Sequence, residues 1–289
     1  MKFHFIEDYR DEFPVTRMCQ VLEVSASGYY AWRRRPVSQR EQDNQELLAQ
    51  IKEVHAASRK TYGSPRVHAE LVQQGTQCNK KRVERLMRVN DIRGKQRGRR
   101  RVKTTDSAHD LPVAPNVLNR QFEADAPNQK WVTDITYIPT DEGWLYLAAV
   151  LDLFSRRVIG WSMARTLCTS LVKNALRMAI ADRHPQAGLL HHSDRGSQYA
   201  SADYQSLMDA HEMVVSMSRT GNCYDNAPME SFFGTLKCEL VHDRHYGTHA
   251  EARQDIFEYI EVFYNRKRRH SSLGYLSPVE YEQSGASVC

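Results

Sequence analysis

The chain has 289 residues, of which 41% are hydrophobic and 26% charged, and its formal net charge is +5. This length suits one sizeable hydrophobic core together with one or two small modules. No apolar run approaches the ~18–20 residues that a membrane-spanning helix needs, and the opening MKFHFIEDYRDEF is too charged for a secretory signal. We therefore expect a soluble cytoplasmic protein without a membrane partner.

The six cysteines are widely spaced and include no C-x-x-C pair, which argues against a structural zinc site. Nothing in the composition suggests secretion, so we expect reduced thiols that serve as small buried or half-buried side chains. They are Cys19, Cys78, Cys168, Cys223, Cys238 and Cys289.

The pattern of residues 1–42 predicts short helices that together have the size of a helix-turn-helix. Pro14 is expected at the start of one helix, and Ser25 or Ser27 can cap the next. The aromatic residues of this segment are expected to pack in its core rather than to stack on bases. They are Tyr29, Tyr30 and Trp32.

Residues 43–103 predict a second helix-turn-helix module, which binds DNA. The apolar stripe of its first helix consists of Leu47, Leu48, Ile51 and Val54. Ser64 is expected to cap the second helix, with Pro65 in the first turn and an end near Gly75. Asn79 can cap a third helix. A short capped helix followed by a basic amphipathic one is the arrangement that docks in the major groove of DNA.

Positive charge is concentrated in this module, because residues 80–103 contain twelve Lys and Arg residues against two acidic ones. This segregation indicates contact with nucleic acid, whereas an ordinary solvated face carries more interleaved acids. On the third helix, the basic side chains that surround the apolar face are Lys80, Lys81, Arg82, Arg85 and Arg88. The segment after it has no helical period, which predicts a flexible basic arm whose phosphate contacts come from Arg99, Arg100 and Arg101.

Residues 104–124 lack periodicity and are interpreted as a linker. The remaining residues, 125–289, predict one larger α/β domain. Its three β-rich runs, QKWVTDITYI, WLYLAAVLDLF and RRVIGWSM, are joined by short turns and favour an antiparallel meander. Helix, strand, helix, strand and helix follow at 171–183, 188–193, 202–210, 213–217 and around Glu230. An amphipathic helix over 250–266 and a basic tail at 266–269 close the chain.

Three carboxylates occupy unusual places in this domain: Asp134 interrupts a β-rich run, Asp194 ends another, and Glu230 lies one turn into a helix. Each has a structural alternative, because an Asp can shape a turn and a Glu near a helix start favours the helix dipole. An Asp inside a strand is rarer. Three acids on three elements can converge on paired Mg²⁺ ions, which phosphoryl transfer on nucleic acid requires. The sequence therefore indicates a candidate polynucleotidyl transferase.

Six motifs carry a resemblance to a known family. WVTDITYI, HSDRGSQY, TGNCYDNAPMESFFGTLK and YNRKRRHSSLGYLSP are similar to the catalytic core of bacterial insertion-sequence transposases. The similarity is to the downstream reading-frame product of the IS-three family, which is related to retroviral integrases. FPVTRMCQVLEVSASGYYAW and YGSPRVHAEL also fit that family, so the resemblance covers nearly the whole chain.

The resemblance implies an α/β ribonuclease-H-like integrase core preceded by small all-α helix-turn-helix modules. It implies that the metal ligands and catalytic residues are Asp134, Asp194 and Glu230, with two Mg²⁺ ions per site and Mn²⁺ as a substitute. Asp134 would bridge both ions, and the other two acids would bind one ion each. Lys237 lies seven residues after Glu230 on the same helix face and would approach DNA, although an ordinary surface lysine is the alternative. Asp152 and Asp225 do not match the acid positions of the family.

The function expected from these observations is DNA transposition. The enzyme would nick the ends of its element, free 3′-hydroxyls and join them to DNA, in a copy-out pathway through a circular intermediate. Its expected partners are double-stranded DNA (the terminal repeats and the target), further copies of the chain on DNA, and an upstream-frame helix-turn-helix product, as fusion or partner. The expected location is the bacterial cytoplasm, at the nucleoid when DNA is bound.

Two other functions are compatible with parts of the sequence. A non-catalytic DNA-binding regulator of the transposase fusion could occupy the element ends without cutting them, although intact acids argue against lost catalysis. A plain ribonuclease H would share the acids, but it would not need the roughly sixty residues of basic helical module that precede the core.

Overall fold

The computed structural model describes residues 1–96 and 111–285. The chain forms two compact units, the first of which is Met1–Lys52 while the second begins at Glu53. Their boundary falls inside one long helix, α4 (Gln39–Ala57). Within the described ranges, no helix is both long and apolar enough to cross a membrane. The finer division into 1–42, 43–103, 104–124 and 125–289 stays a prediction.

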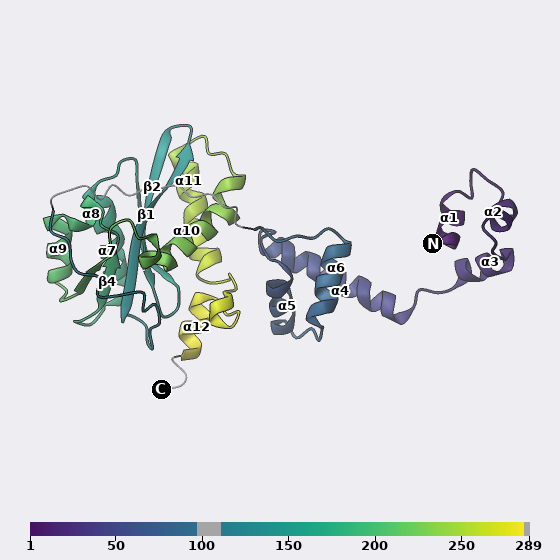
Figure 1. Cartoon of the computed structure of the whole chain (residues 1–289), viewed down its shortest axis with the longest axis horizontal. Helices are drawn as coiled ribbons and strands as arrows, with labels where there is room; N and C mark the ends of the chain where they lie inside the picture. The colour runs from purple at the N-terminus through teal and green to yellow at the C-terminus, as the bar shows by residue number, and fades with distance from the viewer. Residues whose placement is uncertain (97–110, 286–289) are drawn as a thin grey trace. The chain divides into compact units, whose positions relative to one another are not determined.

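The first unit contains a small module of short helices (Figure 1). Its helices are α1 (Lys2–Asp8), α2 (Val15–Val21) and α3 (Ala26–Arg34), and the core consists of Ile6, Met18, Cys19 and Tyr29. Ser25 caps α3, because its hydroxyl accepts a hydrogen bond from the backbone N–H of Gly28 at 3.0 Å. Tyr29 is buried and Trp32 packs against it, as expected, whereas Tyr30 stays 42% exposed.

The second unit begins with a helical module made of the end of α4, α5 (Ser64–Gln73) and α6 (Lys80–Val89). Asn79 caps α6 as expected, since its side chain accepts from the Lys81 N–H at 2.9 Å. The prediction of Ser64 as the cap of α5 was wrong by one residue, because Gly63 holds the N-cap position and Ser64 is already helical. Pro65 lies in the first turn, where the N–H that it lacks would have no helical partner.

The described part of the expected linker, residues 111–124, contains no helix or strand but packs against the sheet domain. Leu118 is only 1% exposed. The backbone N–H groups of Val117 and Leu118 both donate to the Ser216 hydroxyl, at 2.9 and 3.0 Å. This segment is therefore bound along one edge of the sheet before β1 begins.

A five-stranded mixed sheet forms the centre of the second unit. Its strands are β1 (Lys130–Thr140), β2 (Gly143–Asp152), β3 (Val158–Ala164), β4 (Leu190–Ser193) and β5 (Val214–Met217), in the order β3-β2-β1-β4-β5. The first three form the predicted antiparallel meander, and β4 and β5 run parallel to β1. This order is the one expected for a ribonuclease-H-like domain.

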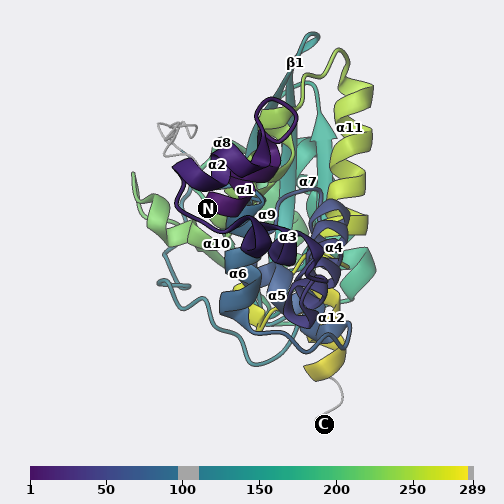
Figure 2. The ribbon, with the colours of Figure 1, turned by 90° about the vertical axis from the view of Figure 1, so that its right-hand side faces the viewer.

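Helices cover both faces of the sheet (Figure 1). On one face lie α7 (Thr169–Arg183), α8 (Ser197–Ala200) and α9 (Ala202–Asp209), over a core that includes Trp131, Val150, Leu176 and Tyr204. On the other lie α10 (Ala227–Glu239) and α11 (His249–Phe257), which both contact β1. In both views α11 lies alongside the long β1–β2 hairpin (Figures 1 and 2). Helix α7 begins two residues before the expected start at 171, with Cys168 as its N-cap.

The C-terminal part departs most from expectation. The predicted helix over 250–266 is α11 followed by a π-helical stretch, Glu258–Tyr264. The short helices η1 (Cys223–Asn226), η2 (Val241–Asp243), η4 (Ser271–Leu273) and α12 (Pro278–Gly285) were not foreseen. The basic run at 266–269 is only half on the surface. Arg268 and Arg269 are 4% and 6% exposed and form ion pairs with the carboxylates of Glu239, Glu70 and Glu280.

Candidate active site

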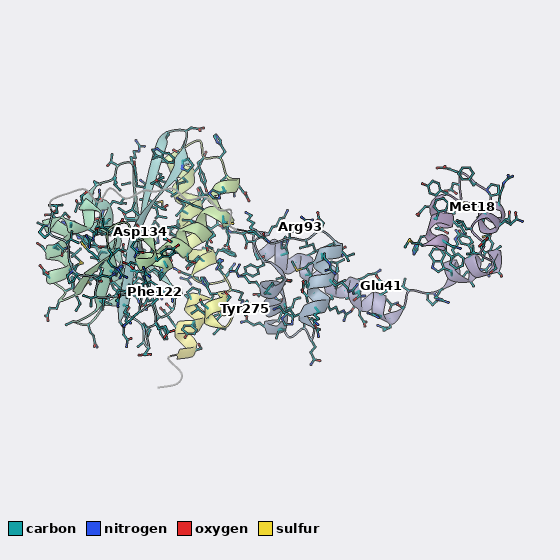
Figure 3. All side chains as sticks on the ribbon, viewed as in Figure 1. Met18, Glu41, Arg93, Phe122, Asp134 and Tyr275 are labelled. Atoms are coloured by element: carbon teal, nitrogen blue, oxygen red, sulfur yellow. The ribbon has the colours of Figure 1, made fainter. Side chains whose placement is uncertain are left out.

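Asp134 and Asp194 are brought together by the pairing of two parallel strands. In this pairing Trp131 lies opposite His191 and Val132 opposite His192. Two residues further in the same register, Asp194 follows the end of β4 beside Asp134. Adjacent strands are ~4.8 Å apart, so the two carboxylates share one end of the sheet. Asp134 lies among the strands at the centre of the second unit (Figure 3).

Glu230 reaches the same place from the N-terminal end of α10. The Asn226 side chain donates from Nδ2 to the Thr133 carbonyl oxygen at 2.9 Å, and Asn226 is 5% exposed. Thr133 directly precedes Asp134, and Glu230 comes one helical turn after Asn226. This single hydrogen bond therefore fixes the start of α10 against β1, with Glu230 near Asp134. Because Asn226 is buried, it shapes the start of the helix.

The electrostatics of Asp134 report how close the three acids are. Burial raises the pKa of Asp134 well above its ordinary value, and the negative charges of Asp194 and Glu230 raise it further. A hydrogen bond from the Ile135 N–H, at 2.8 Å, and the positive charge of Lys237 act in the opposite direction. Mutual repulsion among carboxylates is what a bound cation relieves.

Lys237 lies on the same face of α10 as Glu230, as the spacing predicts. Its Nζ lies 5.1 Å from the centre of the Tyr137 ring. Burial lowers the pKa of Lys237, and the negative charge of Asp134 opposes this. Lys237 is thus a half-buried cation at the carboxylate site rather than an ordinary exposed lysine. Contact with DNA remains a prediction.

The donor chemistry of the three acids suits a magnesium ion, which prefers oxygen ligands. Among the residues described, however, no three His, Cys, Asp or Glu side chains are close enough together to form a preformed metal cage. Gly196 N–H donates to Asp194 Oδ1 at 2.9 Å, so Asp194 is held by its own turn. The three carboxylates fit the ion by the chemistry of their oxygen donors.

Asp152 and Asp225 are structural carboxylates, although both lie near the site in sequence. Asp152 is 0% exposed and accepts from the backbone N–H groups of Asn128 and Phe154, both at 2.8 Å. Asp225 is also fully buried, and it accepts from Asn116, Arg120 and Arg219 at 2.8–2.9 Å. Hydrogen bonds from Arg219 hold the pKa of Asp225 well below its usual range.

His191 and His192, which precede Asp194 on β4, are both buried in the sheet domain. His191 Nε2 pairs with the Tyr204 hydroxyl at 2.8 Å. His192 Nδ1 lies 2.8 Å from the Ser216 hydroxyl. Because Ser216 already accepts two backbone N–H groups, its own proton is left for His192 Nδ1. Burial lowers the pKa of His192 to about 4, so this ring is neutral.

The predicted DNA-binding residues of α6 form a surface separate from the carboxylates. Val83, Leu86 and Met87 are buried, while the exposed basic side chains are Lys80, Lys81, Arg85 and Arg88. Arg82 is half-buried. Arg99, Arg100 and Arg101 lie outside the described residues.

Sequence reasoning missed the polar network at residues 216–226 that supports the site. Asp225 ties the segment before β1 to the turn before α10, and Arg195 ties the end of β4 to Ser218 and Thr220 at 2.6 and 2.7 Å. The run of polar residues in SRTGNCYDN was the available signal, but it is equally typical of an exposed loop.

Comparisons with known proteins agree with this architecture. Family models described as integrase core domain match residues 124–223 and 230–285, and one described as HTH-like domain matches 42–100. The transposase InsF of insertion sequence IS3A from Escherichia coli K12 is 45% identical over 284 residues, 98% of each chain. The uncharacterized 31 kDa protein of insertion element IS600 from Shigella sonnei is 47% identical over 266 residues, covering 92% of this chain and 97% of that one.

The solved structures that match this chain are less similar to it in sequence. A chain of the simian T-cell lymphotropic virus intasome in complex with PP2A regulatory subunit B56 gamma is 14% identical, with a TM-score of 0.47 over 80% of this chain and 74% of that one. The HTLV-2 integrase catalytic core domain in complex with magnesium is 17% identical, with a TM-score of 0.42 over 54% of this chain and 97% of that one. The integrase core match and the strand order confirm the ribonuclease-H-like fold. With near-complete coverage at 45% identity, the chain belongs to the IS3 family of insertion-sequence transposases.

Proposed function

We propose that this transposase is a metal-dependent polynucleotidyl transferase that nicks element ends and joins the freed 3′-hydroxyls to DNA. The observation that carries the proposal is the convergence of Asp134, Asp194 and Glu230 from a strand, a strand end and a helix. Their mutual influence is visible in the raised pKa of Asp134. A set of like charges held together against repulsion is typical of a functional site.

The three acids would hold two Mg²⁺ ions, or Mn²⁺ in their place, through their carboxylate oxygens. When bound, such ions supply activation of the attacking oxygen and charge stabilisation at the leaving oxygen of an in-line displacement. Asn226 and the Gly196 N–H hold Glu230 and Asp194 in position. Lys237 would lie beside the DNA backbone, since it is a half-buried cation whose charge acts on Asp134. This chemistry requires no Ser or Tyr nucleophile of the protein.

The expected DNA partners are the terminal repeats of the element and a target duplex. The exposed basic side of α6 supports this assignment, because Lys and Arg on a capped helix suit the phosphates that flank the major groove. The transposase name of the relatives at 45% identity supports it as well. Assembly of several copies on DNA, and fusion to or pairing with an upstream-frame product, are proposed from the family resemblance.

The test is a nicking and strand-joining assay on an end duplex, run together with a gel shift on the same preparation. Asp134→Asn keeps the shape of the side chain but removes its charge, so nicking should be abolished while end binding stays intact. Glu230→Gln should behave in the same way. Asp209→Asn, on the exposed surface of α9, is the matched control and should nick normally.

Near-wild-type nicking by Asp134→Asn would remove the three acids from the mechanism. Wild-type protein that binds ends but never cuts them, in Mg²⁺ or Mn²⁺ and also as a fusion with an upstream product, would instead establish the regulator function.

A further inference from the structure

A cavity of about 330 Å³ beside α10 collects three arginine side chains from distant parts of the chain. They are Arg66 of α5, Arg156 of the β2–β3 turn and Arg268, which follows the π-helical stretch. Phe122, labelled in Figure 3, contributes to the wall, and the exposed Ser231, Ser271 and Ser272 lie where the cavity meets solvent. None of these residues belongs to the carboxylate site.

The cavity holds more positive than negative charge among its described neighbours. Glu239 pairs with Arg268 at 2.6 Å and lies 3.9 Å from Arg66. Arg156 donates to the Phe122 carbonyl oxygen at 3.2 Å rather than to a carboxylate. Asp152, the acid whose charge acts on Arg156, is already occupied by two backbone N–H groups and Arg183. Among the ion pairs of the described residues, Glu239 is therefore the one carboxylate paired with any of these three guanidinium groups.

Two further groups show that the three cations converge. The pKa of His270 is lowered well below its ordinary value by burial and then by the positive charges of Arg268, Arg66 and Arg156. Arg268 Nη1 lies 3.3 Å from His270 Nε2, so the ring nitrogen accepts there. The pKa of Arg66 is lowered by burial and by Arg268. Burying several positive charges side by side is unfavourable because they lose hydration and repel one another. An anion that binds among them offsets both effects.

The position of the cavity indicates which anion. Ser231, on its rim, directly follows Glu230 on α10, so the cavity opens about a quarter-turn round the helix from the proposed metal ligand. Guanidinium forks and hydroxyls are the groups that contact DNA phosphates. We propose that the cavity binds one backbone phosphate of the DNA that lies along α10, and so sets the register of the strand at the active site. This inference rests on the proposed function only in taking DNA as the partner.

The experiment uses the full chain and measures binding without chemistry. Single phosphates of an end duplex are replaced one at a time by neutral methylphosphonates, and affinities are measured by fluorescence anisotropy without divalent metal. One modified position should weaken wild-type binding about 10-fold, the range of a charge-assisted hydrogen bond. Arg156→Gln should bind unmodified DNA about 10-fold more weakly and lose its sensitivity to that position. Its slope of log K against log[salt] should fall by ~0.9, one phosphate contact.

Two other variants keep the test independent of folding. Ser272→Asp places a negative charge at the exposed rim and should weaken binding in the same position-specific way. Arg177→Gln, on the exposed surface of α7, should keep the wild-type methylphosphonate pattern. The proposal predicts one DNA position at which methylphosphonate substitution weakens binding of the wild type but of neither Arg156→Gln nor Ser272→Asp. If there is no such position, the proposal is overturned.

Inorganic phosphate, added at constant ionic strength, separates the two sources of this anion. Thermal stabilisation of wild-type protein by phosphate, together with an unchanged methylphosphonate pattern in Arg156→Gln, would assign the cavity to a free anion and overturn the DNA assignment. If the methylphosphonate effect is position-specific but the protein never nicks DNA, the assignment of the cavity to a DNA phosphate stands. Only the proposed catalytic function is then contradicted.

Discussion

The Asp134 carboxyl illustrates how a site residue can oppose folding. Its pKa is raised well above the ordinary value by burial, by Asp194 and by Glu230. For an acid whose pKa is higher in the folded than in the unfolded state, ionisation disfavours the fold. This destabilisation is present above the folded-state pKa, and it is relieved as the pH falls towards the unfolded value of ~3.9.

Asp134→Asn should therefore raise the melting temperature of the metal-free protein near neutral pH. For a chain of this size, each kcal/mol added to the free energy of unfolding raises the melting temperature by ~2–4 °C. The difference from wild type should shrink as the pH is lowered towards ~4. Addition of Mg²⁺ should stabilise wild-type protein, by ~2.7 kcal/mol at a hundred times the Kd, and leave the variant unchanged. Thermal unfolding with EDTA and with Mg²⁺ measures both effects. A lower melting temperature of the variant with EDTA, relative to Asp209→Asn, would contradict this account.

At the scale of elements, β3 and α7 pack closely against each other at Gly160. A Cβ atom on Gly160 would lie 2.3 Å from the Ala175 carbonyl oxygen and 2.7 Å from the Ala179 backbone nitrogen. Both are backbone atoms, so no side chain can rotate out of the way. The absence of a side chain at Gly160 is what allows the helix to lie against the strand.

Gly160→Ala should accordingly destabilise the protein by ~1–3 kcal/mol or more, the range of overpacked cores. Urea denaturation monitored by circular dichroism measures the change. Gly247→Ala is the matched control, because its Cβ would meet the Glu251 carboxylate at an ordinary 3.5 Å. Equal stability of the two variants would show that β3 and α7 can separate at little cost.

Sequence patterns predicted those elements that are defined by local periodicity. The three antiparallel strands, α7, α9 and α10 were expected within a few residues, because alternation and helical spacing are properties of each segment alone. Element ends were less certain, as at Ser64 and Thr169. The π-helical stretch before Asn265 was not predictable, since Asn265 makes two side-chain hydrogen bonds to the Val158 backbone, at 2.9 and 3.0 Å, across the fold.

The candidate site shows the same division. The sequence motifs predicted Asp134, Asp194 and Glu230 as site residues. The contacts that hold these side chains in position, however, join residues far apart in sequence. The Asn226–Thr133 hydrogen bond joins residues 93 positions apart. Arg268 and Arg269 belong to the predicted basic tail, and charged residues usually lie on the surface. Their partners Glu239 and Glu70 are on other elements, and no periodicity links them.

At the scale of the whole molecule, basic charge is segregated from the sheet domain. Twelve of the 40 Lys and Arg residues fall between positions 80 and 103. Exposed basic groups that contact phosphates release counterions from DNA, and this makes affinity depend on salt. Affinity for DNA in general should therefore be governed by this run, whereas cleavage is governed by the acids.

Replacing Arg99, Arg100 and Arg101 by Gln should flatten the slope of log K against log[salt] by up to ~3, because each phosphate contact contributes ~0.9. Nicking at saturating protein should persist, since the three acids are untouched. Equilibrium binding to an end duplex between low and moderate salt gives the slope. An unchanged slope would mean that this run is a solvated tail without phosphate contacts.

The three proposed metal ligands differ in how firmly the fold holds their backbones. Asp134 lies inside β1, which is paired with β2 from Trp131 to Thr140 and accepts a hydrogen bond from Asn226 at the preceding residue. Asp194 follows the last paired residue of β4, and Glu230 depends on the start of one helix. Local opening is least costly at strand ends and helix ends and most costly in central strands. The backbone at Asp134 therefore shares the stability of the whole sheet, and adjustment to an incoming ion or DNA strand falls to the other two ligands.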